Sequence, residues 1–252
     1  MNIMIINGSP KKEGGASAFF AKILRFMLFP HKVTTISLGV SKDYREIFEN
    51  LQNTDAVVIT VPLYVDSIPA HFIHLLKEME QFCKNNKCKF KLYVISNAGF
   101  VGGHHNEAHL EQYQCWCERT GITWGGGLGI GGGVMLHVLY KIMLIWTSIE
   151  IVISVIYNIF AGIPVMESVN NILLPGLSGC LIRILFFYCG MLLFEFILAW
   201  AIRNKKSIKN KYTRVMLPSF IFIIVADIFM ALTGMFHGKF IFPLFKKVKY
   251  TN

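Results

Sequence analysis

The chain has 252 residues and a formal net charge of +10, and this charge is distributed unevenly. Residues 1–133 carry 13 basic and 11 acidic side chains, whereas residues 134–252 carry 12 and 4. The first part has the balance of a soluble domain, while the second alternates apolar runs with basic clusters, as is typical beside an anionic membrane face. The basic residues do not alternate with aromatic residues on a polar face, so we expect no nucleic-acid partner.

The cysteines and the start of the chain bear on metal binding and on the cellular compartment. Six cysteines are present but no C-x-x-C pair, which argues against a zinc ribbon or an iron–sulfur cluster, and we expect reduced thiols and no metal site. The sequence enters a strand-like run at once, without the basic and apolar regions of a signal peptide. The N-terminal domain is therefore expected in the cytoplasm.

Short apolar runs alternate with amphipathic segments along the first half of the chain. Continuous apolar runs are typical of parallel strands that are buried on both faces, and helical spacing in the segments between them indicates crossover helices. The expected strands are residues 2–6, 33–38, 56–61, 91–95 and 122–130, and the expected helices are residues 17–29, 43–51, 70–83 and 106–119. This order predicts an α/β fold with a doubly wound five-stranded parallel sheet, whose ligands bind at the carboxyl ends of the strands.

The first expected strand ends in the sequence NGSPKKEGGAS, residues 7–17, which opens directly onto a helix. Glycines let backbone amides approach a phosphate, the helix N-terminus adds partial positive charge, and Ser9 and Ser17 can donate hydroxyl hydrogen bonds. The turn is not a nucleotide P-loop, because Gly14 is followed by Gly15 and Ala16 rather than Lys and Ser or Thr. It predicts an anion site, with an ordinary turn capped by Ser17 as the alternative.

Two further strand ends favour the anion site. VPLYVDSIPAH, residues 61–71, follows the third strand, and SNAGFVGG, residues 96–103, follows the fourth. All three loops belong to one edge of the sheet, and the last two offer aromatic residues, glycines and amides that could border a flat heterocycle such as flavin. Tyr64 or His71 could contact a substrate, or could serve only in packing or capping.

These loops give the chain a resemblance to the flavodoxin-like NAD(P)H-dependent FMN reductase and quinone reductase family, over roughly residues 1–133. The resemblance rests on NGSPKKEGGAS, VPLYVDSIPA, SNAGF and the later WGGGLGIGGG. It implies FMN as cofactor, NADH or NADPH as electron donor, and a homodimer. Relatives often carry Asn followed by Ser or Thr at the end of the first loop, whereas Gly15 and Ala16 supply no side-chain donor, so we expect weaker FMN binding.

The resemblance also implies the residues that contact FMN. At the phosphate they are Ser9, Lys11, Gly15, Ala16 and Ser17, at the ring Pro62, Leu63, Tyr64 and Val65, and opposite them Asn97, Ala98, Gly99 and Phe100. Hydride moves between nicotinamide and flavin once the rings stack, so no catalytic acid or base is expected. The implied function is transfer of electrons from NAD(P)H to a quinone, a flavin or another small acceptor. The alternative is a non-catalytic electron carrier or binding module docked to a membrane partner.

Two other motifs are interpreted as structural. Gly127, Gly129 and Gly132 match G-x-G-x-x-G in spacing, but they follow the fifth strand, outside the βαβ context of a dinucleotide site. We expect these glycines to allow tight turns near the flavin. His105 and His109 stand four residues apart and could face one metal ion, but no further ligand is fixed by the sequence.

The apolar second half predicts membrane attachment. Residues 1–163 are expected to form the FMN-binding domain, closed by a helix over residues 147–161, and residues 164–252 a helical, membrane-associated region. Residues 181–202 and 217–236 are each about as long as a bilayer span. The six basic residues between 203 and 214 should stay in the cytoplasm. Two spans starting from a cytoplasmic domain would place them outside, and three spans would place them inside but export Lys246, Lys247 and Lys249. Surface-lying or re-entrant helices therefore stay open as alternatives.

Overall fold

The computed structural model describes residues 1–40, 43–163, 165–216 and 218–236. The chain divides into two compact units, Met1–Met216 and Leu217–Asn252. In the first unit a sheet is built from β1 (Asn2–Asn7), β2 (Lys32–Ser37), β3 (Ala56–Pro62), β4 (Lys91–Asn97), β5 (Thr123–Gly131) and β6 (Lys211–Arg214). Its helices are α1 (Ala16–Met27), α2 (Arg45–Leu51), α3 (Ala70–Asn86), the 3₁₀ helix η1 (Gly103–Asn106), α4 (Glu107–Thr120), α5 (Gly133–Phe160) and α6 (Val165–Arg203). The second unit contains α7 (Ser219–Phe236).

The sheet is parallel throughout and has the strand order β2-β1-β3-β4-β5-β6. All five strands expected from the apolar runs are present, and the order reverses between β1 and β3, as in the flavodoxin-like arrangement. The sixth strand was not expected. It lies within the basic segment after α6 and pairs Leu128–Gly131 of β5 with Lys211–Arg214.

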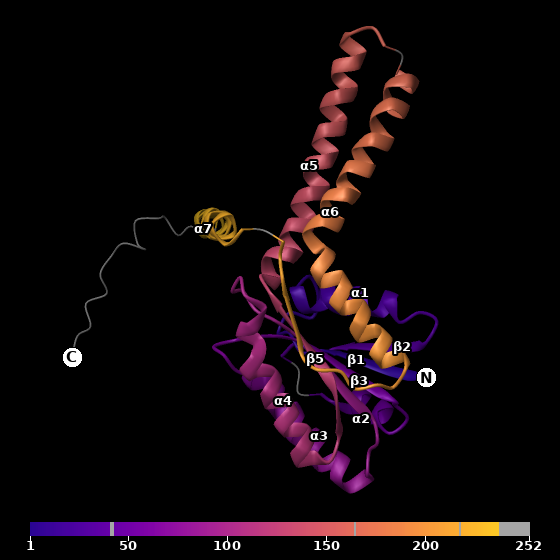
Figure 1. The fold of residues 1–252 in the computed structure, drawn as a ribbon, viewed down its shortest axis with the longest axis vertical. Coiled ribbons are helices and arrows are strands. Elements are labelled where there is room, and N and C mark those ends of the chain that lie inside the picture. The colour runs from indigo at the N-terminus through magenta and orange to yellow at the C-terminus, as the bar shows by residue number, and fades with distance from the viewer. Residues whose placement is uncertain (41–42, 164, 217, 237–252) are drawn as a thin grey trace, which may run out of the picture. The chain divides into compact units, whose positions relative to one another are not determined.

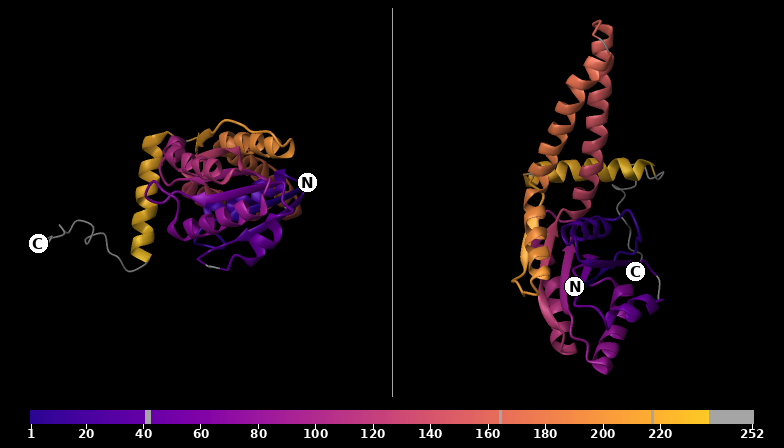
Figure 2. Two further views of the ribbon diagram at one scale, coloured as in Figure 1. Left: turned by 90° about the horizontal axis from the view of Figure 1, so that it is seen from below. Right: turned by 90° about the vertical axis from the view of Figure 1, so that its right-hand side faces the viewer.

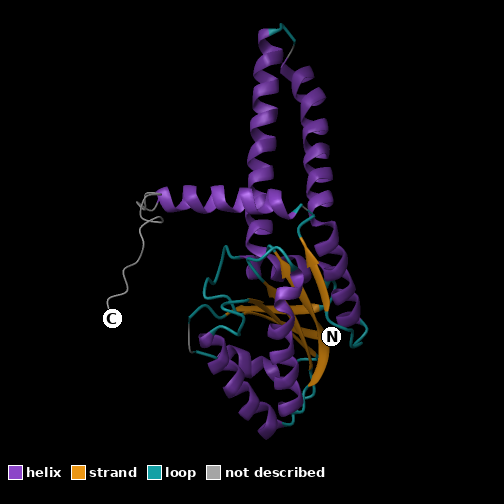
Figure 3. Ribbon diagram, turned by 60° about the vertical axis from the view of Figure 1, so that its left-hand side comes forward, coloured by secondary structure: helices purple, strands orange, loops and turns teal. Residues whose placement is uncertain are grey.

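Helices cover both faces of this sheet (Figure 2). Met4, Val57 and Leu92 point to one face, where the largest apolar cluster packs beneath α2, α3 and α4. The strands' alternating neighbours point to the other face, which α1 and the last turns of α6 cover. Figure 3 shows the sheet between these two layers.

The helix expected over residues 147–161 does not close the sheet. Those residues belong to α5, which pairs with α6 in an antiparallel hairpin that runs away from the sheet (Figure 1). The end of α6 takes the covering position instead, because Leu198, Ala201 and Ile202 are buried there. The domain boundary expected at residue 163 thus falls inside the first unit.

Within the described part of the chain, two helical segments are long and apolar enough to cross a membrane, judged by length and composition. They are Val138–Phe160 and Pro175–Arg203, with mean hydropathies of 1.9 and 2.1. The segment expected over residues 217–236 corresponds to α7, whose apolar part, Ser219–Leu232, is shorter.

Candidate functional site

The loop between β1 and α1 is shaped by the side chain of Asn7. Its Oδ1 accepts a hydrogen bond from the Ser9 amide at 3.1 Å, and its Nδ2 donates to the Lys12 carbonyl at 3.2 Å. The Lys11 amide donates to Ser9 Oγ at 3.3 Å. Gly14 has a φ of +71°, the left-handed conformation that glycine adopts without strain. Two short polar side chains thus curl the loop back toward the start of α1.

The start of α1 is suited to an anion. Gly15 is the N-cap residue, and within the described residues no side chain caps the helix. The first amides of a helix have no partner inside it and carry its positive dipole end, so they are available to a phosphate. Lys11 is exposed in the same loop. These features fit the phosphate of FMN.

Histidine 71 supports this loop from α3. Its Nε2 lies 3.0 Å from the Gly8 carbonyl oxygen, within hydrogen-bond distance. This contact gives His71 a structural role, beside the contact with a substrate that the sequence left open.

The loop after β3 ends in a tight two-residue turn. The Tyr64 amide donates to the Ser67 carbonyl at 3.4 Å, and the Ser67 amide donates to the Tyr64 carbonyl at 3.1 Å. Between them Val65 and Asp66 have φ values of +50° and +55°. A β-branched residue is strained in this conformation, and strain of this kind is concentrated at ligand sites. The Val65 side chain is 98% exposed at the tip of the turn.

A glutamine from α4 holds this turn in place. Gln112 Oε1 accepts hydrogen bonds from Ser67 Oγ at 3.3 Å and from the Ile68 amide at 3.4 Å, and Nε2 donates to the Asp66 carbonyl at 3.4 Å. Gln112 was not among the residues expected at the site. The sequence around it gives no signal of this role, because the role depends on the contact between α4 and a distant loop.

The loop after β4 is tied to the end of β5 by backbone hydrogen bonds. The Ala98 amide donates to the Ile130 carbonyl, the Gly133 amide donates to the Ala98 carbonyl, each at 2.9 Å, and the Gly132 amide donates to the Phe100 carbonyl at 2.6 Å. The Phe100 ring is 59% exposed and lies 4.9 Å from the His105 ring. A Cβ added to Gly99 would meet no atom within 4 Å. The loop therefore offers an open backbone and one exposed aromatic ring.

The thirteen expected contact residues all lie on these three loops, but they differ in accessibility. Lys11, Tyr64, Val65, Gly99 and Phe100 are exposed, Gly15, Ala16 and Pro62 are half-buried, and Ser9, Ser17, Leu63, Asn97 and Ala98 are buried.

The side chains of Asn97 and Ser17 are hydrogen-bonded within the protein and are not open to a ligand. Asn97 Nδ2 donates to Ser17 Oγ at 2.9 Å and to the Val61 carbonyl at 3.0 Å. One buried amide thus joins the ends of β3 and β4 to the first turn of α1. The side chain of Asn97, which was expected opposite the ring, points into the protein, where it holds the three loops together.

A buried polar cluster lies behind the third loop and was not anticipated. Ser96 Oγ donates to Asn106 Oδ1 at 2.6 Å and lies 2.7 Å from His109 Nδ1. Asn106 Nδ2 donates to the Gly103 carbonyl at 3.0 Å. Burial lowers the pKa of His109 to about 4, so its imidazole is neutral at physiological pH. His105 is exposed while His109 is buried, so the two do not share a face for a metal ion.

The glycines of β5 serve close packing. A Cβ added to Gly127 would lie 2.8 Å from the Leu110 side chain, and one added to Gly129 would lie 2.9 Å from the Gly103 carbonyl oxygen. The expectation of tight turns is wrong for these two, which lie within the strand against α4 and η1. Gly132 does make a turn, with a φ of +67°, where β5 passes into α5.

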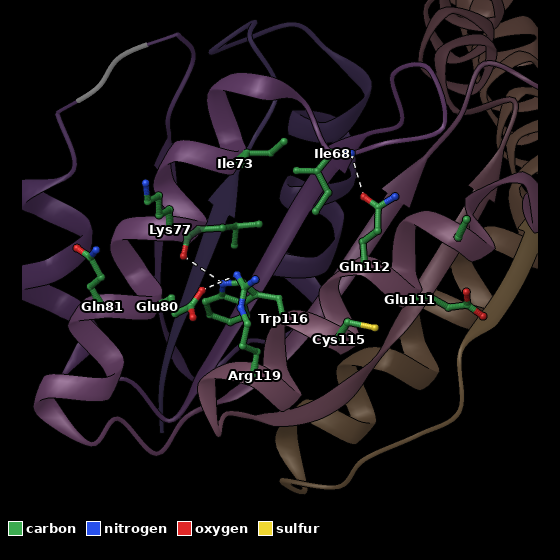
Figure 4. Close-up of a pocket in the computed structure, with 12 residues that line it drawn as sticks. Ile68, Ile73, Lys77, Glu80, Gln81, Glu111, Gln112, Cys115, Trp116 and Arg119 are labelled. Atoms are coloured by element: carbon green, nitrogen blue, oxygen red, sulfur yellow. Dashed lines mark hydrogen bonds and ion pairs between the residues drawn. The ribbon is translucent and has the colours of Figure 1, made fainter.

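A groove of about 950 Å³ lies beside the second loop, between α3 and α4 (Figure 4). Ile68, which follows the turn at 64–67, contributes to its wall. Trp116 Nε1 donates to the Leu76 carbonyl at 3.1 Å, and Arg119 forms an ion pair with Glu80. The groove lies over a helical face and is separate from the start of α1.

No family model matches the sequence, and no curated protein matches it. Among solved structures, the chain is similar to the Trp repressor binding protein from Bacillus subtilis, with 17% identity over 53% of this chain and 88% of that one, and a TM-score of 0.45. The NAD(P)H:quinone oxidoreductase from Methanothermobacter marburgensis has 17% identity over 52% and 84% of the two chains and a TM-score of 0.41. The azoreductase from Bacillus anthracis str. Sterne has 12% identity over 54% and 89%, with a TM-score of 0.41. The order and direction of β1 to β5 themselves define the α/β unit as flavodoxin-like.

Proposed function

We propose that the chain is an FMN-dependent oxidoreductase that takes electrons from NADH or NADPH and passes them to a quinone, a flavin or another small acceptor. One observation carries this proposal. The α1 N-terminus, without a side-chain cap in the described residues, lies at the point where the strand order reverses between β1 and β3. In open α/β sheets of this order, ligands bind outside the carboxyl ends of the strands at this point.

The residues would divide the work of holding FMN. The uncapped backbone amides at the start of α1 and the Lys11 ammonium group would bind the phosphate. Tyr64 and Val65 on one side, and Gly99 and Phe100 on the other, would border the ring, while Asn97 keeps the loops at a fixed separation. When bound, FMN supplies the hydride and electron transfer chemistry, which needs no acid or base from this site.

A phosphate-specific comparison tests the cofactor assignment. The full-length protein in detergent is titrated with FMN and with riboflavin, which lacks the phosphate, and binding is followed by flavin fluorescence. Lys11→Ala should weaken FMN binding roughly fivefold, about 1 kcal/mol, and leave riboflavin binding unchanged. The control is Lys22→Ala, because Lys22 is also exposed but lies farther along α1. A protein that takes up neither flavin, or a Lys11→Ala variant that binds FMN like wild type, would contradict the assignment.

A second candidate is a non-catalytic electron carrier docked to a membrane partner. It is favoured by the exposure of Val65 and Phe100 at the edge of the site, since apolar exposed side chains also suit a protein partner. Anaerobic addition of NADH or NADPH to the FMN-loaded protein separates the two. Bleaching of the flavin absorption without an added partner supports the enzyme, and bleaching only in the presence of a partner reductase supports the carrier.

A further inference from the structure

The hairpin of α5 and α6 separates from the α/β unit at an aromatic contact with α1. The Phe19 ring lies 5.8 Å from the Tyr140 ring and 6.2 Å from the Tyr188 ring, and the Tyr188 hydroxyl donates to the Leu136 carbonyl. Beyond this point the two helices contact each other and no longer contact the sheet (Figure 1). The contact with α1 therefore marks the base of the hairpin.

The hairpin is long enough for a bilayer. Val138–Phe160 has 23 residues, which rise about 35 Å as a helix, and the hydrocarbon core of a membrane is about 30 Å thick. Residues 165–187 of α6, between the tip and the base, rise about 34 Å, and residues 175–187 of this arm belong to the apolar segment Pro175–Arg203. Both arms can reach across.

Where the side chains of the two arms are described, large apolar residues make up much of the exposed surface. Ile153, Tyr157 and Phe160 of α5 are 61%, 72% and 88% exposed, and Ile182 of α6 is 65% exposed. A soluble protein rarely presents a continuous apolar surface of this extent to water. Apolar side chains therefore cover the outside of this hairpin as well as part of its interior, where Met143 and Cys180 are buried.

Several polar side chains of the hairpin form bonds within it, although the buried Thr147 Oγ1 has no hydrogen-bond partner among the described residues. Arg183 Nη2 lies 3.1 Å from Glu150 Oε2 across the two helices, and Trp146 Nε1 donates to Glu150. Ser148 Oγ donates to the Leu144 carbonyl at 2.9 Å. In hydrocarbon a charged group must be paired and a polar group must find its partner inside the protein. The hairpin meets both conditions at these bonded side chains.

The ends of the hairpin have opposite character. The tip at residues 161–163 has no charged side chain. At the base, Lys141 is exposed, and the basic segment that follows α6 returns to the α/β unit. There Arg203 donates to the Met27 and Phe29 carbonyls, and Lys205 Nζ forms an ion pair with Asp55 at 2.8 Å. This is the asymmetry that the positive-inside rule describes.

We infer that the α5–α6 hairpin crosses a lipid bilayer, with its tip at residues 161–163 on the far side and the Glu150–Arg183 ion pair within the hydrocarbon. The α/β unit and the whole basic segment then lie on one side, as the positive-inside rule requires of this segment. The β5–α5 junction is bonded to the Phe100 loop, so the proposed cofactor loops lie beside the membrane surface. The inference does not depend on FMN. The competing occupant of the apolar surface is a second copy, forming a four-helix bundle in water.

Cysteine accessibility tests the crossing. Ala161→Cys places a thiol at the exposed tip, and Lys209→Cys places one in the exposed basic segment. The full-length variants are expressed in a bacterial host and treated with a membrane-impermeant maleimide, against the background of the wild-type exposed cysteines, Cys115 and Cys189. The tip should react in intact cells and the basic segment only after permeabilisation. If both react only after permeabilisation, or if carbonate extracts the chain as a soluble oligomer, the inference is overturned.

The ion pair provides an independent test, because its worth depends on the medium. The side chains of both partners are 41% exposed. In water, an ion pair with this exposure contributes little to stability. In hydrocarbon, Glu150→Gln would leave an arginine that cannot lose its proton, and should lower the carbonate-resistant fraction at least roughly tenfold. The double variant Glu150→Gln/Arg183→Gln should recover most of it.

The matched control for the ion pair is Arg119→Gln, which breaks the exposed pair with Glu80 in the α/β unit and should leave membrane retention unchanged. If Glu150→Gln behaves like this control, the pair is in water and the inference is overturned. Neither test measures flavin binding, so failure here is distinguishable from failure of the proposed function.

Discussion

Gly131, the last residue of β5, offers a direct test of how the third loop is positioned. A Cβ added at Gly131 would lie 2.2 Å from the Val101 carbonyl oxygen and 2.5 Å from the Gly102 carbonyl carbon. Both are backbone atoms that cannot rotate away, so the loop would have to shift by about 1 Å. Overpacking of this kind costs about 1–3 kcal/mol, and loosening of the hydrogen bond between Gly132 and Phe100 adds about 1 kcal/mol. We expect Gly131→Ala to lower the free energy of unfolding by about 2–4 kcal/mol.

The matched control is Gly99→Ala, because a Cβ there meets no atom within 4 Å. It should change stability by less than about 0.5 kcal/mol. Thermal unfolding of the full-length protein in detergent, followed by tryptophan fluorescence, should show a Tm lower by about 5–15 °C for Gly131→Ala and little change for Gly99→Ala. FMN binding should weaken in the first variant, because the loop that it displaces carries Phe100. Equal stability of the two variants would refute the assignment of the β5 glycines to close backbone packing.

Three further predictions concern buried and paired groups. Asn97→Asp removes the donor shared by Ser17 and Val61 and should cost about 2–3 kcal/mol of stability, measured by denaturation. The pKa of His109 is about 4 in the folded state and near 6.5 in the unfolded state, so the unfolded state binds more protons between these two pH values. The free energy of unfolding should therefore fall by about 3 kcal/mol as the pH drops from 6.5 to 4. His109→Gln should abolish this dependence. The side-chain hydrogen bond from Lys205 lowers the pKa of Asp55, so its contribution is present above the ordinary carboxyl range and is lost as pH falls through the lowered pKa; Lys205→Met should reduce this acid sensitivity in pH-dependent melting.

The first five strands could be predicted, and most directly β1, β3 and β4, because parallel strands buried on both faces must be apolar throughout. β3 and β4 have continuous runs of this kind, and each is almost fully buried. β6 could not be predicted, since it is a four-residue edge strand with a lysine and an arginine at its ends. Its pairing depends on β5, where Gly129 leaves room for the Tyr212 ring and Asn210 Oδ1 accepts a hydrogen bond from the Gly127 amide at 3.0 Å. No local pattern encodes that contact.

The position of the three loops could be predicted from the sequence, but the direction of their side chains could not. A loop that follows a parallel strand must lie at the carboxyl edge, so the positions of Lys11, Tyr64 and Phe100 follow from the strand order. Whether Asn97 faces a ligand or the protein interior depends on what surrounds it. Here Gly133 approaches so closely that a Cβ would lie 2.7 Å from Asn97 Cβ, and the amide is turned toward Ser17. The chemistry of a residue type alone does not show which of these positions it occupies.

The polar stripe on α5 shows how a helix with a correctly identified periodicity can be assigned to the wrong packing partner. Thr147, Glu150, Ser154 and Asn158 do lie at helical spacing, and Thr147 is buried. In a soluble domain a polar stripe faces water and the apolar remainder faces the sheet, which is the reasoning that assigned this helix to close the domain. The ion pair between Glu150 and Arg183 reverses that reasoning, because this part of the stripe faces α6 and the apolar remainder is exposed. Periodicity therefore identifies an amphipathic helix, but only the surrounding medium decides which face is the interior. For α5, the exposed apolar face is the one that requires a partner.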